Sequence, residues 1–226
     1  MKNWNDQNRN TRATLITRPF FSIIITTYNR VLLLRRALDS LLSQTEADWE
    51  AIIVDDESTD DTYLQILPYL SSNPKIKYVR KEHSGEVLSK NEGIYSSRGK
   101  FISFLDSDDE YDPVHLASRK RILMQHPYLE FLYGGAMIIG NQFVPDRFDY
   151  SKKINLNKCV IGGTFLVQRK ILLALHGFRK MPIGTDGDLF DRARNAGIVM
   201  MEVITPTYIY HRETQNSITT NLCVAP

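Results

Sequence analysis

KFISFLDSDDEYDP (residues 100–113) joins an apolar run, a cluster of carboxylates and a helix start within fourteen residues. The apolar run 101–105 is typical of a buried strand, and Asp112 followed by Pro113 is a signal for the start of a helix. Five carboxylates follow the run: Asp106, Asp108, Asp109, Glu110 and Asp112. Like charges this close repel one another, and removing them from water is costly. The stretch therefore predicts a strand end with either a solvated turn or a bound cation.

The same unit of strand and helix occurs three times before this stretch. Apolar, β-branched runs predict strands at 20–25, 49–54 and 75–79. Helical periodicity or caps predict helices at 29–44, from about 58 to 70, and at 85–99. Gly99 is expected to be the C-terminal cap of the last of these helices. The fourth unit is the strand 100–105 with the helix 112–126. Four such alternations predict a parallel, doubly wound α/β sheet with right-handed crossovers.

The pattern changes after residue 126. Residues 129–148 predict a hairpin that turns at Gly140-Asn141. Further strands are expected at 159–167, 199–204 and 207–211, and helices at 168–177 and 188–197, each ended by a glycine. The second half is therefore expected to be mixed α+β and to continue the first sheet.

Composition limits the class of protein. The chain has 226 residues, 42% of them hydrophobic, and a formal net charge of +2, which is too small to indicate a nucleic-acid partner. Cys159 and Cys223 are far apart and predict neither a disulfide framework nor a zinc site. Residues 1–18 form a polar arm without a signal-peptide segment, and no apolar run is long enough to span a bilayer. We expect a cytoplasmic protein; the basic residues of the arm leave a membrane tether as an alternative.

Polar residues follow three of the predicted strands. They occupy 26–29, 55–58 and 106–109. Ligands of open α/β sheets bind outside the carboxyl ends of the strands. Two carboxylate clusters at one edge predict a hard divalent cation such as Mg²⁺ or Mn²⁺, which commonly completes its coordination with substrate phosphates.

Other acidic and phosphate-binding motifs do not fit. An EF-hand loop counted from Asp106 requires Gly where Tyr111 stands, and a phosphatase-type nucleophile requires Thr or Val where Glu110 stands. Neither a P-loop nor a G-x-G-x-x-G sequence is present. These observations weigh against calcium, phosphatase, nucleotide triphosphatase and dinucleotide-binding functions.

Six segments together resemble the family 2 glycosyltransferases, which have the A-type glycosyltransferase fold. In chain order they are SIIITTYNR, AIIVDDESTDDT, SGEVLSKNEGIYSSRGKFISFLDSDDEYDP, GGTFLVQRKILLALHGF, GTDGDLFDRARNAG and YHRETQNSIT. The resemblance covers roughly residues 20 to 217. It implies a single A-type domain over 19–217, in which a Rossmann-like nucleotide-binding sheet (19–115) continues into a mixed α+β acceptor half (116–217). An arm (1–18) and a tail (218–226) would flank it.

The resemblance also implies which residues bind the nucleotide. Thr26, Tyr28 and Asn29 match contacts of the first strand and its loop, and Asp56 matches a carboxylate that accepts a hydrogen bond from the ring N–H of the base. Uracil and guanine both offer such a donor, so Asp56 does not choose between them. Lys90 stands where many relatives carry Arg; it would neutralise a phosphate as a point charge, with an exposed helix lysine as the alternative.

The metal and the catalytic base are implied in the same way. Asp106 would lie near the ribose and the metal shell, and Asp108 would bind Mn²⁺ or Mg²⁺ directly. Asp186 takes the place of the catalytic base, with a simple helix N-cap as the alternative. His211 would contact the metal and Arg212 the diphosphate, with a solvated strand end as the alternative. Asp109 is interpreted as a turn residue.

The expected function is that of an inverting glycosyltransferase. It would move a sugar from a nucleoside-diphosphate sugar, with a UDP-sugar favoured, to a glycan, lipid-linked or protein acceptor. Contact with the inner face of the membrane would be at most peripheral. Two alternatives stay open: a catalytically inactive protein that binds sugar nucleotides or acts as a scaffold, and a sugar nucleotidylyltransferase, which would need a Gly-rich, Arg-containing loop where TTYNR stands.

Overall fold

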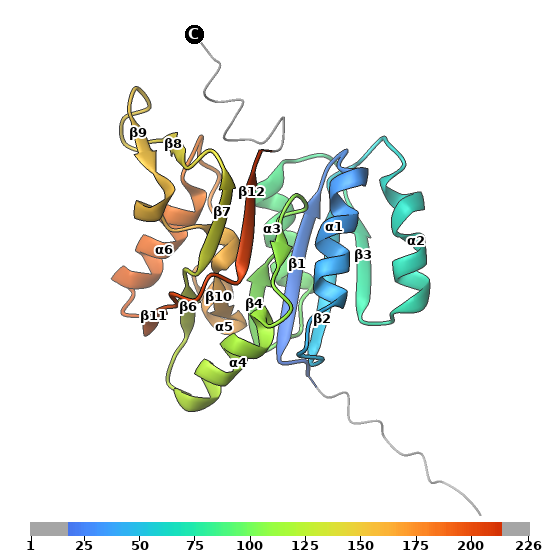
Figure 1. Ribbon diagram of the computed structural model, residues 1–226, viewed down its shortest axis with the longest axis horizontal. Helices are drawn as coiled ribbons and strands as arrows, with labels where there is room; N and C mark the ends of the chain where they lie inside the picture. Colours follow the sequence, from blue (N-terminus) through green and yellow to red (C-terminus); the bar gives the residue numbers. More distant parts are fainter. Residues whose placement is uncertain (1–17, 214–226) are drawn as a thin grey trace, which may run out of the picture.

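The computed structural model describes residues 18–213, in which one large sheet is covered by helices on both faces (Figure 1). Residues 1–17 and 214–226, including almost all of the predicted arm and the whole of the predicted tail, lie outside the described residues. The seven strands of the large sheet, in spatial order, are β11 (Met200–Glu202), β6 (Phe131–Tyr133), β10 (Leu166–Gln168), β4 (Phe101–Phe104), β1 (Phe21–Thr27), β2 (Trp49–Asp55) and β3 (Ile76–Arg80).

The four strands predicted from the repeated unit form the parallel part of this sheet. β1 pairs in parallel with β2 and with β4, and β2 pairs in parallel with β3. β10 then runs antiparallel between β4 and β6. The prediction that the second half continues the first sheet is confirmed, and the point of reversal lies at β4 and β10.

Each face of the sheet has its own core. Side chains of β1 alternate between the faces, with Ile23 and Ile25 in one core and Ile24 in the other. The first core includes α1 (Val31–Leu42), α2 (Thr62–Ser72) and α4 (His115–Gln125). The second includes α3 (Glu86–Ser96), α5 (Arg169–Ala174) and α6 (Thr185–Asn195). Burial on both faces explains why these strands read as unbroken apolar runs.

The hairpin predicted over 129–148 is wrong. β7 (Ala136–Gly140) pairs in parallel with β12 (Tyr208–Arg212), which also pairs with β5 (Glu110–Tyr111). β8 (Phe143–Pro145) pairs instead with β9 (Lys153–Asn155), in a hairpin whose turn stands out at the upper left of Figure 1. Gly140-Asn141 therefore separates two sheets, because the partner of β7 comes from the end of the described chain.

Several predicted ends also shift. The helix expected from Asp112 begins at His115, since Asp112 Oδ1 accepts a hydrogen bond from the amide of Val114 in a preceding turn. α3 ends at Ser96, so Gly99 is not its cap; a Cβ at Gly99 would lie 2.5 Å from the backbone nitrogen of Ser22. The strand expected over 159–167 is β10 alone, preceded by short 3-10 turns at Leu156–Lys158 and Gly162–Thr164.

Candidate active site

The carboxyl ends of β1, β2 and β4 bring the three predicted polar clusters to one edge. The backbone joins the first two, because the Asp56 amide donates to the Thr27 carbonyl at 2.9 Å. Asn29 adopts a left-handed backbone conformation (φ 51°), and its Oδ1 accepts the Thr59 amide at 2.8 Å. Asn29 therefore holds the loops after β1 and β2 together. Thr26, at the end of β1, is half-buried.

Asp56 lies in a nearly buried pocket of donors supplied by the loop after β3. Its Oδ1 accepts from Lys81 Nζ at 2.9 Å and from the Ser84 amide at 3.0 Å, and its Oδ2 accepts from the Gly85 amide at 2.8 Å. The Nδ1 of His83 lies 2.8 Å from Oδ2. Burial alone would raise the pKa of Asp56, but the hydrogen bonds from Lys81, Ser84 and Gly85 outweigh it and lower the pKa to about 2.

Through His83, Asp56 also adjoins an aromatic pair. The exposed ring of Tyr28 packs on the ring of His83, with 4.4 Å between their centroids. A carboxylate offers about four acceptor positions, and these are taken by Lys81, by the amides of Ser84 and Gly85, by the Ser84 hydroxyl at 3.5 Å and by the ring of His83. A nucleotide base that donates a hydrogen bond to Asp56 must therefore displace one of these donors. The side chains of Lys81 and His83 can move aside without breaking the backbone turn.

Asp106 and Asp108 each face a cation. Asp106 Oδ1 lies 3.3 Å from Lys90 Nζ, and Asp108 Oδ2 lies 2.8 Å from Arg30 Nη1. Arg36 also donates to the backbone carbonyl of Asp108. Burial raises the pKa of Asp108, and the nearby charge of Asp106 raises it further. Arg30 opposes both effects. The carboxylates of this acidic loop (residues 106–109) therefore repel one another, and Lys90 and Arg30 offset only part of that repulsion.

Asp109 is a buried anchor of the loop and not a solvated turn residue. Its Oδ2 accepts from Tyr208 Oη at 2.5 Å, and its Oδ1 accepts the His211 amide at 2.8 Å. Burial, together with Asp106 and Asp108, raises its pKa well above the ordinary value. The sequence interpretation of Asp109 is corrected here, because its partners lie about 100 residues along the chain, in β12.

His211 and Arg212 both belong to β12 and are buried, so neither is part of a solvated strand end. The ring of His211 makes contacts of 2.7 Å from Nε2 to Glu110 and 3.1 Å from Nδ1 to Glu213. The Arg212 guanidinium donates to the carbonyls of Asn141 and Phe143. His211 therefore lies beside the acidic loop, whereas these contacts of Arg212 point toward the segment between β7 and β8.

Lys90 is buried, which excludes the alternative of an exposed helix lysine. Its Nζ lies 2.5 Å from Glu86 Oε1, in addition to its contact with Asp106. Burial alone would lower the pKa of Lys90, but the charges of Asp106, Glu86 and Asp186 outweigh it and keep the pKa well above the ordinary value. Lys90 is thus a permanent positive charge among three carboxylates.

Asp186 reaches this cluster from the second half of the chain. It is the second residue of α6, and its Oδ2 accepts the Gly162 amide at 3.0 Å. The N-cap position is Gly184, so the simple N-cap interpretation of Asp186 is wrong. Burial raises the pKa of Asp186, Lys90 opposes this, and Glu86 and Asp106 add to it. Because β10 is antiparallel to β4, the segment before β10 lies beside the loop after β4 and brings Gly162 to this edge.

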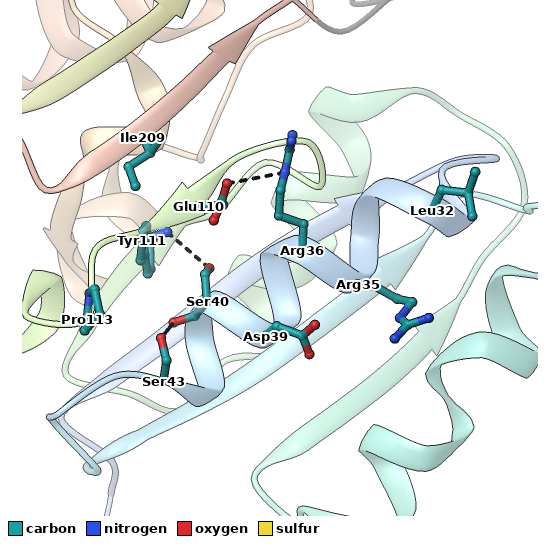
Figure 2. Close-up of a pocket in the computed structure, with 10 residues that line it drawn as sticks. All are labelled: Leu32, Arg35, Arg36, Asp39, Ser40, Ser43, Glu110, Tyr111, Pro113 and Ile209. Carbon is teal, nitrogen blue, oxygen red and sulfur yellow. Dashed lines mark hydrogen bonds and ion pairs between the residues drawn. The ribbon is translucent and has the colours of Figure 1, made fainter.

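A groove with a volume of about 640 Å³ lies behind the acidic loop, between α1, β5 and β12 (Figure 2). Arg36 spans its upper part, with its Nε 3.6 Å from Glu110 Oε1, and Ser40 Oγ accepts the Tyr111 amide at 3.1 Å. The predicted site residues do not line this groove. Arg36, which lines the groove, also contacts the acidic loop, whereas the residues of the Lys90 cluster do not line it.

A family model, glycosyl transferase family 2, matches residues 22–172, a span that includes Asp56, Lys90 and the acidic loop. The chain belongs to this family. Among its curated relatives, a UDP-Glc:alpha-D-GlcNAc-diphosphoundecaprenol beta-1,3-glucosyltransferase of Escherichia coli is 32% identical over 67% of this chain and 61% of its own. A GalNAc(5)-diNAcBac-PP-undecaprenol beta-1,3-glucosyltransferase of Campylobacter jejuni is 32% identical over 61% of this chain and 42% of its own. The family 2 chain therefore spans less than two thirds of these relatives.

Solved structures show the same fold. Staphylococcus aureus TarS in complex with UDP superposes with a TM-score of 0.72 at 20% identity, over 84% of this chain and 60% of that chain. A mannosyltransferase of Pyrobaculum calidifontis, in complex with GDP-Man and Mn²⁺, gives a TM-score of 0.70 at 19% identity, over 86% and 57%. The predicted A-type glycosyltransferase fold of the family 2 chain is confirmed.

The donor set fits a divalent cation that is completed by substrate oxygens. Within residues 18–213 no three His, Cys, Asp or Glu side chains are grouped to hold an ion by themselves. Asp106 and Asp108 nevertheless share one loop, and burial together with the charge of Asp106 raises the pKa of Asp108. Oxygen ligands of this kind suit Mg²⁺ or Mn²⁺, which accept few protein ligands when phosphates supply the rest. Such an ion would polarise a diphosphate and offset its charge.

Sequence reasoning missed the cations and the backbone partners of the site. Arg30, Lys81 and Gly162 each contact a predicted site carboxylate, and none of them was proposed. Arg30 lies inside the motif SIIITTYNR and Gly162 inside GGTFLVQ, so the motifs marked the segments without marking these roles. Charge balance was the available signal: two acidic clusters at one edge require nearby cations, and Arg30 follows the first polar loop directly.

Proposed function

We propose that this chain is an inverting glycosyltransferase that uses a nucleoside-diphosphate sugar and a divalent cation. The observation that carries the proposal is the shared position of Asp186 and Asp106 around Lys90. One carboxylate comes from the half expected to bind the acceptor and the other from the loop expected to bind the donor. A base and a donor site must lie near each other for a direct transfer, because the reacting atoms have to approach to about 3–3.5 Å.

The donor is proposed to be a UDP-sugar. The Escherichia coli relative is named for UDP-Glc, and TarS is seen with UDP. Asp56 and the Tyr28–His83 pair offer an acceptor and an aromatic surface for a base, and both suit uracil. The acceptor is proposed to be lipid-linked, since both named relatives act on undecaprenol-linked sugars.

The proposed reaction is a single displacement at the anomeric carbon. The acceptor hydroxyl oxygen forms a bond to that carbon while the bond to the diphosphate oxygen breaks, and the hydroxyl proton passes to the Asp186 carboxylate. A pKa raised by burial makes Asp186 a stronger base than a solvated aspartate. Lys90 would offset negative charge as it develops on the leaving diphosphate.

The test is a transfer assay with radiolabelled UDP-glucose, UDP-GlcNAc and GDP-mannose, using a diphosphoundecaprenol-linked sugar as acceptor, with Mn²⁺ and with chelator. We expect metal-dependent formation of labelled lipid-linked product and of free nucleoside diphosphate in equal amounts. Binding of a sugar nucleotide without turnover on any acceptor would support the inactive scaffold instead. Release of pyrophosphate from a sugar phosphate and a nucleoside triphosphate would indicate a nucleotidylyltransferase.

A further inference from the structure

The β8–β9 hairpin presents two aromatic side chains to solvent. Phe148 is 84% exposed and Tyr150 is 60% exposed, and both lie in the turn between the two strands. Single exposed apolar residues are common on protein surfaces, but two large rings in one short turn are not. The hairpin is also the part of the molecule that stands out at the upper left of Figure 1.

The turn is ordered in a way that keeps these rings outside. Asp146 Oδ1 accepts the Phe148 amide at 2.8 Å, and Asp149 Oδ1 accepts the Ser151 amide at 3.2 Å. The Asp146 amide donates to the Lys152 carbonyl at 2.9 Å and closes the turn. The backbone of the turn is thus fixed by hydrogen bonds to its own acidic residues.

The hairpin is fastened to the helix that carries Asp186. Arg147 Nη2 lies 2.5 Å from Asp191 Oδ2, and a Cβ at Gly187 would lie 2.1 Å from Arg147 Nη1. Both partners belong to α6. A surface that binds the tip of the hairpin would therefore also restrain the helix that carries the proposed base.

Two lysines without an ion pair follow the aromatic turn along the chain. Lys153, at the start of β9, and Lys158, shortly after β9, are exposed and form no ion pair within residues 18–213, whereas Lys152 pairs with Asp149. Rings beside lysines are a composition that anchors proteins at a bilayer interface, where the rings enter the headgroup layer and the lysines are attracted to anionic lipid.

We propose that the β8–β9 hairpin docks on an anionic lipid bilayer through Phe148 and Tyr150. The proposal deepens the proposed function, and it rests on it for the lipid-linked acceptor. Within residues 18–213 no helix combines the length and apolar character needed to cross a bilayer, so this part of the chain would reach a lipid-linked acceptor by surface contact. Docking would hold α6 and Asp186 at the height above the bilayer where the sugar of the lipid-linked acceptor projects beyond the lipid headgroups.

The test measures sedimentation of the full chain with vesicles of phosphatidylglycerol and phosphatidylcholine in equal parts, without sugar nucleotide or metal. We expect binding that salt weakens, and weaker binding to vesicles of phosphatidylcholine alone. The double variant Phe148→Ser/Tyr150→Ser should bind at least about tenfold more weakly, since each ring loses its apolar burial. The matched control is Tyr128→Ser, because Tyr128 is 63% exposed and belongs to the segment between α4 and β6, which lies low in Figure 1 and away from the β8–β9 hairpin.

Four results would overturn the proposal. Three of them are no vesicle binding by the native chain, equal binding by the double variant, and equal losses in the double variant and in Tyr128→Ser. A double variant that loses self-association in gel filtration but keeps vesicle binding would assign the tip to contacts between copies of the chain, which also overturns it. The vesicle assay contains neither donor nor acceptor, so its outcome is separate from a failure of glycosyl transfer, which the transfer assay detects as the absence of labelled product.

Discussion

The amide of Gly162 donates a hydrogen bond of 3.0 Å to the carboxylate of Asp186, and a side chain at position 162 would occupy the space of that carboxylate. A Cβ there would lie 2.4 Å from Asp186 Oδ1. The glycine in this family motif therefore has a positional reason: it leaves room for the proposed base and fixes one of its oxygens.

Gly162→Ala should reduce sugar transfer by about 10²-fold, because a small displacement of a reacting group has an effect of that size. Nucleotide binding, measured by calorimetry, should stay close to that of the native chain. Gly93→Ala is the control, since its Cβ would meet the side chain of Ile24 in the core. It should lower the melting temperature while the folded protein keeps its turnover.

Asp186→Asn should lower turnover by about 10²–10⁴-fold while UDP binding and melting temperature change little. In the native chain the base works only when it is deprotonated, and burial raises its pKa. Activity should therefore fall on the acid side at a pH above the ordinary aspartate value of 3.8. Near-native transfer by the asparagine variant would place the base elsewhere.

Lys90→Met should move this acid limb to still higher pH. The positive charge of Lys90 lowers the pKa of Asp186, and methionine keeps much of the volume without the charge. A profile of kcat/KM against pH measures the shift. An unchanged acid limb with a uniformly lower rate would mean that Lys90 serves only the diphosphate.

Arg30→Gln should strengthen Mn²⁺ binding, because Arg30 both occupies Asp108 Oδ2 and repels a cation. A part-buried pair of this kind is worth about 1 kcal/mol, so affinity should rise by roughly fivefold. Arg35→Gln, which removes an exposed charge from the adjoining helix α1, is the matched control. Equal affinities in the native chain and both variants would remove Asp108 from the metal site.

Asp56→Asn should destabilise the fold in a way that depends on pH. A carboxyl whose folded pKa is about 2 stabilises the protein above its unfolded value of 3.8, and this contribution is lost as pH falls through the folded value. The difference in unfolding free energy should be about 2 kcal/mol near pH 7 and about half of that near pH 3. A difference that does not change with pH would show that the donors around Asp56 do not depend on its charge.

The sequence predicted the elements that are determined locally. The strands before Thr27, Asp55 and Asp106 are continuous apolar runs followed by polar loops, so the parallel part of the sheet and its functional edge could be placed. The partner of β7 could not, because β12 is the last strand of the described chain and no local pattern links Ala136 to Tyr208. Pairing at long range depends on three-dimensional packing, which periodicity does not encode.

The candidate site shows the same division. Asp56, Asp106, Asp108 and Asp186 could be proposed from motifs, and the structure brings the last three of these carboxylates near one another. Their partners depend on loops from different units: Lys81 follows β3, and Arg30 precedes α1. The buried role of Asp109 could not be inferred, since an acidic residue in an acidic turn has the same sequence signature whether it is solvated or anchored.

The antiparallel pairing of β10 with β4 also limits how this enzyme fold can change over evolution. The acidic loop follows β4, and Gly162, whose amide holds Asp186, lies shortly before β10, so these two segments are carried by neighbouring strands about 4.8 Å apart. New acceptors would therefore have to be accommodated by changing the outer segments, such as the β8–β9 hairpin, while the distance over which a sugar is passed stays constant.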